Sequence, residues 1–489
     1  MPTALGLAGL ALATVPAIDL AQLQNAVKLE ALLAKAQRLQ DIAYATEGRN
    51  RQYLSPGFAN TISWIKDTIE ATAPGYYKIE VQPTTFQVPS ADNPFTVGGT
   101  TYNAQGFETD EGIPVGSWTG VPVVAVANLG CEATDFPDAT GAIAVILRGT
   151  CNFSVKSSLA AAAGAVAVII IDYETSTEPI SGDLGPPEGL VPTAAILYQD
   201  GQAVLSLIES TPDVTADLSI TVTETQSEQL IATTKCGDQN NILMLGGHAD
   251  SVTAGPGIND NGSGSVGILE IALQLSKFEP ANAVRFAWWS GEEYGLLGSY
   301  YYANNLTPEE AAKIRLYLNF DMIASPNYIT GIYDGDGSAF NLTGPAGSAE
   351  AEKLFEDYFT SQSLPFQPTE FSGRSDYAGF IDIGIPAGGL FSGAEVLKTE
   401  EEAALYGGAA GVAYDENYHE AGDDFDNLNH ECFIQMSRAI AHATAKYASS
   451  WEGFPDRGYP IRRREASIRK RRAPHQHAGG ACGGVRAVV

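Results

Sequence analysis

NILMLGGHADSVTAGPGINDNG, residues 241–262, carries the strongest structural signal in the chain. Residues 241–247 are mostly apolar, which is typical of a buried strand, and the sequence then changes abruptly to the polar His248 and Asp250. A glycine-rich turn follows, and residues 263–277 after it show the apolar spacing of a helix. We therefore expect a strand, a polar loop and a helix in succession.

The same alternation continues along the chain. We expect strands at 284–290 and 315–321 and a helix at 296–304 between them. Before and after this region the patterns predict helices at 20–44 and 57–71, a strand at 77–88, and a closing helix at 430–449. Strands that alternate with helices predict an α/β fold, with a mixed, mostly parallel sheet flanked by helices.

Residues 95–225 do not show this alternation of strands and helices. Short β-rich runs occur at 121–129 and 142–147, with one Ala-rich helix and a strand within 157–171. This indicates a β-rich module inserted into the α/β domain. We expect five segments: a signal peptide at 1–17, the first part of the α/β domain at 18–94, the insert at 95–230, the main part at 231–455 and a tail at 456–489.

The formal charge of -30 disfavours nucleic acid and anionic membrane surfaces as partners. The hydrophobic fraction of 44% is that of an ordinary globular chain, and no apolar run is long enough to cross a bilayer. The tail differs from the body, because residues 457–489 carry nine Lys and Arg against one acid. A disordered or processed end and an interaction tail are the alternatives for it.

Several features favour export. Residues 4–17 resemble the apolar region and small-residue cleavage site of a signal peptide, with a buried N-terminal helix as the alternative, since no Lys or Arg precedes them. Cys131 and Cys151 bracket a compact segment and suit a disulfide in an oxidising compartment. Three glycosylation sequons fit a secreted protein, and they lie at Asn152, Asn305 and Asn341. The remaining cysteines have no assigned partner, and they are Cys236, Cys432 and Cys482.

Polar residues follow the carboxyl ends of three predicted strands, which is where α/β sheets bind ligands. They are His248 with Asp250, Glu292 with Glu293, and Asp321. Asp260 lies in the glycine-rich turn, and His419 occurs late in the chain. Histidines mixed with carboxylates suit zinc, so the joint placement predicts a metal site, although each residue alone fits a turn, a solvated helix start or a packed histidine.

The segments that carry these residues resemble successive motifs of the M28 family of zinc aminopeptidases. They are GGHADSVTAGPGINDNGSG, FAWWSGEEYGLLGS, YLNFDMI, FSGRSDYAGF and ENYHEAGD. The insert resembles a protease-associated (PA) domain, as in secreted fungal leucine aminopeptidases. The resemblance implies a zinc exopeptidase-like fold, with a PA domain that either covers the site or is structural.

The resemblance also implies the roles of site residues. One zinc would bind His248 and Asp321, the other Glu293 and His419, and Asp260 would bridge both, with a cis bond to Asn261. Glu292 would be the general base, and Asp250 would accept the other N–H of His248.

Tyr418 would steady the oxyanion or simply pack beside its neighbouring histidine. Arg374 matches a substrate-binding arginine, with a structural ion pair to an acid such as Asp376 as the alternative. Leu390 and Phe391 would border the pocket for the first side chain, which core packing also explains.

We therefore expect a secreted, monomeric aminopeptidase with two zinc ions, acting on peptides with a free N-terminus and apolar, leucine-type first residues. The alternatives are a glutaminyl cyclase or carboxypeptidase of the same fold, and a catalytically silent, receptor-like protein.

Overall fold

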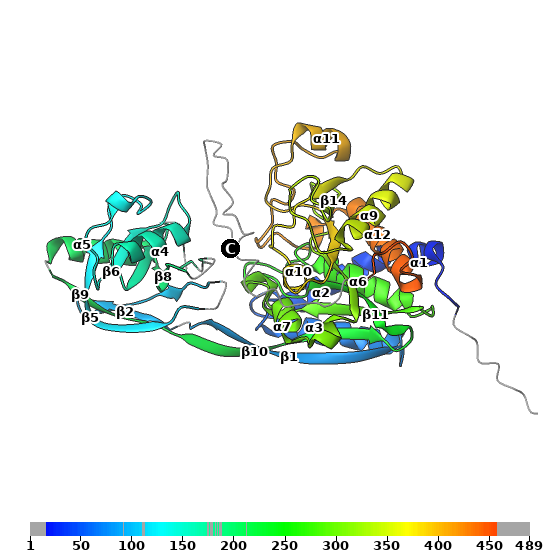
Figure 1. Cartoon of the computed structure of the whole chain (residues 1–489), viewed down its shortest axis with the longest axis horizontal. Coiled ribbons are helices and arrows are strands. Elements are labelled where there is room, and N and C mark those ends of the chain that lie inside the picture. Colours follow the sequence, from blue (N-terminus) through cyan, green and yellow to red (C-terminus); the bar gives the residue numbers. More distant parts are fainter. Residues whose placement is uncertain are drawn as a thin grey trace, which may run out of the picture. The chain divides into compact units, whose positions relative to one another are not determined.

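The computed structural model describes residues 16–456, apart from Ala91, 110–112, 174–175, 177–178, Ser181, Asp183, 185–187 and Pro212. Within this range the chain forms two compact units (Figure 1). The first comprises residues 16–84 and 227–456, and the second comprises residues 85–226. Most of the predicted signal peptide and the basic tail from 457 onward lie outside the described residues.

An eight-stranded sheet forms the centre of the first unit, in the order β1-β10-β12-β11-β13-β16-β14-β15, with the long strands β1 and β10 side by side (Figure 1). Its four central strands, β12, β11, β13 and β16, run parallel, whereas β10 and β14 pair antiparallel with their inner neighbours. The strand bounds are β1 Tyr77–Pro89, β10 Val222–Thr234, β11 Asp238–His248, β12 Asn282–Trp289, β13 Ile314–Phe320, β14 Gly331–Tyr333, β15 Gln367–Thr369 and β16 Ala387–Phe391. The mixed, mostly parallel sheet is confirmed.

The central strands of this sheet are buried on both faces over most of their length, which explains why they are mostly apolar. Leu243 and Leu245 of β11 pack into one core, while Met244 between them packs into another, as the two-residue period of a strand requires. The first core is covered by α1 (Leu20–Ala26), α2 (Leu29–Tyr44), α3 (Pro56–Thr72), α6 (Gly262–Leu275), α9 (Ser348–Ser361) and α12 (His430–Ser449). The second is covered by α7 (Leu297–Asn305) and α10 (Ala378–Asp382).

The helix starts follow from capping side chains. Asn261 accepts from the N–H of Gly264 and opens α6, and Ser55 caps α3, whose first residue is proline. The predicted helix at 20–44 is broken at Lys28, which has an extended backbone and separates α1 from α2. No helix in the described part of the chain is both long enough and apolar enough to span a membrane.

The second unit contains another eight-stranded sheet, in the order β3-β2-β9-β5-β6-β7-β8-β4. The bounds are β2 Pro94–Val97, β3 Thr100–Asn103, β4 Gln105–Gly106, β5 Gly116–Ala125, β6 Ile143–Leu147, β7 Ala167–Ile171, β8 Thr193–Ile196 and β9 Thr215–Ile220, with α4 Phe153–Ala162 and α5 Tyr198–Ser210. The second unit is therefore β-rich, and its sheet is mixed: β6 runs parallel to both β5 and β7, whereas β9 pairs antiparallel with β5.

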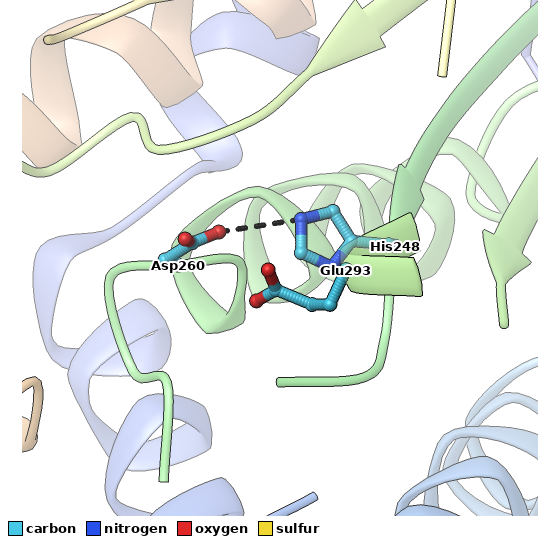
Figure 2. A group of neighbouring side chains, drawn as sticks. All are labelled: His248, Asp260 and Glu293. Carbon is cyan, nitrogen blue, oxygen red and sulfur yellow. Dashed lines mark ion pairs between the residues drawn. The ribbon is translucent and has the colours of Figure 1, made fainter. Parts of the chain in front are cut away.

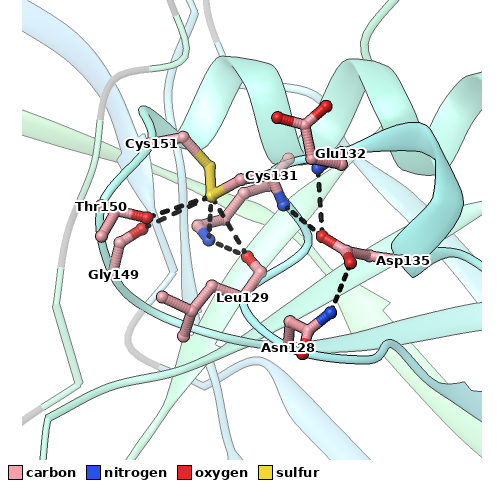
Figure 3. The surroundings of a disulfide bond; sticks show 9 residues. Asn128, Leu129, Cys131, Glu132, Asp135, Gly149, Thr150 and Cys151 are labelled. Atoms are coloured by element: carbon pink, nitrogen blue, oxygen red, sulfur yellow. Dashed lines mark hydrogen bonds between the residues drawn. A yellow bond between two sulfur atoms is a disulfide. The ribbon is translucent and has the colours of Figure 1, made fainter.

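The predicted disulfide is present in this unit, between Cys131 and Cys151 (Figure 3). The buried ammonium group of Lys156 donates to the carbonyl of Leu129 beside it, and Asp135 accepts from the backbone N–H of Cys131 at 3.1 Å. The disulfide therefore lies in an ordered polar cluster. Cys236 and Cys432 are free, and Cys482 lies outside the described residues.

Candidate metal centre

Three neighbouring strands deliver the candidate ligands to one edge of the sheet. His248 is the last residue of β11, and Asp321 directly follows β13. After β12 the chain turns at Ser290 and Gly291 into the short 3-10 helix η2 (Glu292–Tyr294), which contains both glutamates. Because β11, β12 and β13 are parallel, their carboxyl ends meet, as the sequence predicted.

Asp260 lies at the centre of the cluster, in the turn that precedes α6. One carboxylate oxygen, Oδ1, is 3.3 Å from His248 Nε2, and the other, Oδ2, is 3.4 Å from His419 Nε2. Figure 2 shows the carboxylates of Asp260 and Glu293 directed toward the space beside the imidazole of His248. The bond from Asp260 to Asn261 is cis, as predicted.

The other two predicted carboxylate ligands each lie beside a different histidine. Asp321 Oδ1 is 3.2 Å from His248 Nε2, and Glu293 Oε2 is 3.0 Å from His419 Nε2. The structure thus brings all five predicted ligands together as two histidine-carboxylate pairs that share Asp260. The side chain of His248 is fully buried, whereas that of His419 is 32% exposed.

The donor set fits zinc. Nitrogen and oxygen atoms of His248, Asp260 and Glu293 converge within 4.8 Å of one another, and so do those of His248, Glu292 and Asp321. Burial alone would lower the pKa of His419, but Glu293 and Asp260 outweigh it and raise the pKa to about 10. The buried Glu293 Oε1 has no hydrogen-bond partner among the described residues. The site therefore holds an excess of buried negative charge that a bound cation would offset.

Glu292 lies beside this cluster, with its Oε2 3.8 Å from His248 Nε2. Burial raises the pKa of Glu292 well above its usual range, which makes its carboxylate a stronger proton acceptor. Asp250 accepts from the backbone N–H groups of Glu292 at 3.3 Å and Glu293 at 3.4 Å. Its Oδ1 lies 3.6 Å from His248 Nδ1, longer than a hydrogen bond, so its predicted role toward the imidazole stays a prediction.

Tyr418 and Arg374 meet at the rim of the site. The Tyr418 ring stacks on His419 with centroids 3.8 Å apart, and its hydroxyl accepts from Arg374 Nη2 at 3.3 Å. Arg374 also pairs with Glu395 at 2.8 Å. Arg374 thus forms an ion pair, as the alternative expected, but with Glu395; Asp376 as the partner is wrong, since that side chain is fully buried.

The structure adds two residues that the sequence did not single out for the site. Ser375 donates to Asp321 Oδ2 at 2.6 Å, and Asp423 accepts from the backbone N–H of Asn259 at 2.8 Å and of Asp260 at 2.9 Å. Both lie inside motifs quoted above, FSGRSDYAGF and ENYHEAGD, so their proximity to the ligands was the available signal.

The remaining predicted residues are the two pocket residues and the three glycosylation sites. Leu390 is fully buried in the first core, as the core-packing alternative expects, whereas Phe391 is partly exposed. All three sequon asparagines are exposed, which satisfies the access requirement for glycosylation, and they are Asn152, Asn305 and Asn341. Their roles stay predictions.

Comparison with known proteins finds two family patterns in the chain. The pattern of peptidase family M28 matches residues 229–444, and that of the PA domain matches residues 119–204. A probable leucine aminopeptidase 2 of Aspergillus fumigatus is 49% identical over 467 residues, which are 94% of this chain and 91% of the relative. Leucine aminopeptidase 2 of Arthroderma otae is 46% identical and covers 96% of this chain and 93% of its own.

Solved structures show the same fold. A zinc aminopeptidase from Bacillus subtilis superposes with a TM-score of 0.62 at 20% identity, over 89% of this chain and 97% of its own. An aminopeptidase from an Aneurinibacillus species gives a TM-score of 0.60 at 24% identity, over 91% and 98%. The chain belongs to peptidase family M28, and it is a zinc-dependent aminopeptidase.

Proposed function

We propose that the enzyme holds two zinc ions, one at His248 and Asp321 and one at His419 and Glu293, with Asp260 bridging them. The observation that carries this proposal is the orientation of Asp260, whose two oxygens face two different histidines at 3.3 and 3.4 Å. A carboxylate that bridges two metals needs this arrangement, whereas a single-metal ligand does not.

When bound, zinc would act as a Lewis acid that polarises the scissile carbonyl and lowers the pKa of the attacking water. The Glu292 carboxylate takes a proton from that water and delivers it to the nitrogen of the leaving peptide. We propose that Tyr418 donates to the developing oxyanion. Its oxygen accepts from Arg374 Nη2, so its own proton is directed elsewhere.

We propose that the substrate is a peptide with a free N-terminus and an apolar, leucine-type first residue. The buried carboxylates favour an amine, which would lie near Glu292 and Asp321, and disfavour a substrate carboxylate. The leucine preference rests on the names of the fungal relatives.

We also propose that the enzyme is secreted and acts as a monomer. The disulfide and the three exposed sequon asparagines support an oxidising, extracellular location. Secretion is tested by the sequence of the mature N-terminus in culture medium, and the oligomeric state by sedimentation.

The specificity is tested with a leucine-initiated peptide and its N-acetylated form. Acetylation removes the charge and leaves buried polar groups unpaired, so we expect release of leucine from the free peptide and almost none from the capped one. Shortening of the capped peptide from its C-terminus would instead identify a carboxypeptidase. Loss of ammonia from an N-terminal glutamine would identify a cyclase.

A further inference from the structure

Arg51 lies in the segment between α2 and α3 and is 0% exposed. No other arginine in the described part of the chain is buried to this extent. Arg51 also precedes the matched family region, which begins at residue 229. A buried guanidinium is costly unless its donors are satisfied, so its partners indicate what it does.

The guanidinium donates to three backbone carbonyls of one loop. Its Nε donates to Pro256 O at 2.8 Å, its Nη1 to Ala249 O and its Nη2 to Gly257 O. These carbonyls belong to the ligand loop, which we define as residues 249–259, between His248 and Asp260. The side chain therefore ties both ends of the loop to one rigid group.

The backbone around Arg51 strengthens the attachment. Arg51 N donates to Ser251 Oγ at 2.9 Å, Ser251 N donates to Arg51 O at 3.2 Å, and Asn50 Nδ2 donates to Thr253 O at 3.0 Å. The ligand loop is thus held at its start, middle and end by two consecutive residues of the N-terminal region.

Gly257 supplies the room for this contact. Its φ is +61°, and a Cβ there would lie 3.2 Å from Arg51 Nη2 and 2.2 Å from the carbonyl oxygen of Asp260. The carbonyl of Gly257 also accepts from the N–H of Gly262, the first residue of α6, at 3.0 Å. Arg51 and the start of α6 therefore share one acceptor next to Asp260.

The charge of Arg51 also suits this place. Burial lowers its pKa, but the carboxylates of Asp250, Asp423, Asp260 and Glu293 act in the opposite direction. A guanidinium offers five donors in a planar fork, whereas an ammonium group offers a compact point charge. The fork donates to these three carbonyls from three different nitrogens, whereas the three donors of an ammonium group share one nitrogen.

We propose that Arg51 is a positioning residue of the metal centre, which holds the ligand loop in its ligand-ready conformation before zinc binds. This inference rests on the proposed assignment of His248 and Asp260 as zinc ligands. Arg51 acts through the loop, since its bonds go to backbone carbonyls and to no ligand side chain.

The test compares Arg51→Lys and Arg51→Met with Arg285→Met, which removes a partly buried guanidinium bonded to Thr233 and Tyr302. Zinc affinity is measured by competition with a chelator, and folding by circular dichroism and thermal unfolding of the metal-free proteins. We expect both Arg51 variants to bind zinc about 10- to 100-fold more weakly, with the control unchanged. A folded Arg51→Met or Arg51→Lys variant with wild-type zinc affinity would overturn the proposal. In the case of Arg51→Lys, that result would show that a positive charge is enough and that the fork is not needed.

A second measurement uses the unsubstituted enzyme. Hydrogen exchange of the metal-free protein should show residues 249–259 already protected, with little gain after zinc is added. Protection that develops only with zinc would contradict preorganisation by Arg51. Failure of the unsubstituted protein to bind zinc would instead refute the ligand assignment.

Discussion

Replacing Ser375 with alanine should weaken zinc binding without unfolding the enzyme. The Ser375 hydroxyl donates to Asp321 Oδ2 at 2.6 Å and accepts from Asn319 Nδ2 at 2.8 Å. It is 5% exposed, so water cannot easily replace it. Because Oδ2 is held this way, the other oxygen of Asp321 faces His248 Nε2 at 3.2 Å.

The magnitude follows from the type of bond that is lost. A hydrogen bond to a charged group contributes about 1.5–3 kcal/mol. If this hydrogen bond holds the Asp321 carboxylate in the orientation that binds zinc, its loss weakens zinc binding. At about 1.4 kcal/mol for each factor of ten, the expected weakening is roughly 10- to 100-fold. The unpaired Asn319 amide adds a cost to folding of about 1–3 kcal/mol.

Zinc affinity of Ser375→Ala is measured by chelator competition, beside kcat/KM and the midpoint of thermal unfolding. Ser437→Ala is the matched control, because Ser437 is fully buried in α12 and its hydroxyl has no hydrogen-bond partner among the described residues. Equal zinc affinities in Ser375→Ala, Ser437→Ala and the unsubstituted enzyme would refute the reasoning.

Three further outcomes are expected. Glu292→Gln should keep its zinc and lose about 10²- to 10⁴-fold in kcat, whereas Glu293→Gln should lose zinc more readily. Metal analysis and kinetics of both variants test this, and the opposite pattern would exchange the roles of the two glutamates. Serine at both Cys131 and Cys151, which lie 20 residues apart, should lower the free energy of unfolding by about 2–4 kcal/mol in denaturant titration, and an unchanged value would show that the crosslink adds no stability. Burial raises the pKa of Glu352 to about 7, so the folded state favours its protonated form, and this stability is lost as pH rises from the unfolded value of 4.5 through 7. As pH rises over this range, the unfolding midpoint of the unsubstituted enzyme should therefore fall relative to that of Glu352→Gln. A difference between the two midpoints that does not change with pH would contradict the raised pKa of Glu352.

Much of the first unit could be predicted because its central strands are buried on both faces. Mostly apolar stretches such as 241–247 and 315–320 mark β11 and β13, and the polar residues that follow mark the ligand edge. The short strands β14 and β15 have three residues each, too few for a period to be visible, and no prediction covered them.

The ligands could be predicted, whereas their supports could not. His248, Asp260 and Asp321 are polar residues at positions where a strand or turn ends, so their placement is visible in the sequence. Arg51 acts from a segment about 200 residues earlier, through backbone carbonyls that leave no trace in the sequence of the ligand loop. The pairing of Arg374 with Glu395 likewise depends on how two loops fold, since the nearer acid Asp376 points into the interior.

The most direct test of the two-zinc site is a titration of metal-free enzyme with zinc, followed by metal analysis and by hydrolysis of a leucine chromogenic substrate. We predict that two zinc ions bind per chain and that Asp260→Asn, which alters the carboxylate shared by both histidines, weakens both of them. One zinc ion per chain in fully active enzyme, or an Asp260→Asn variant that loses affinity for a single ion only, would contradict the bridged site.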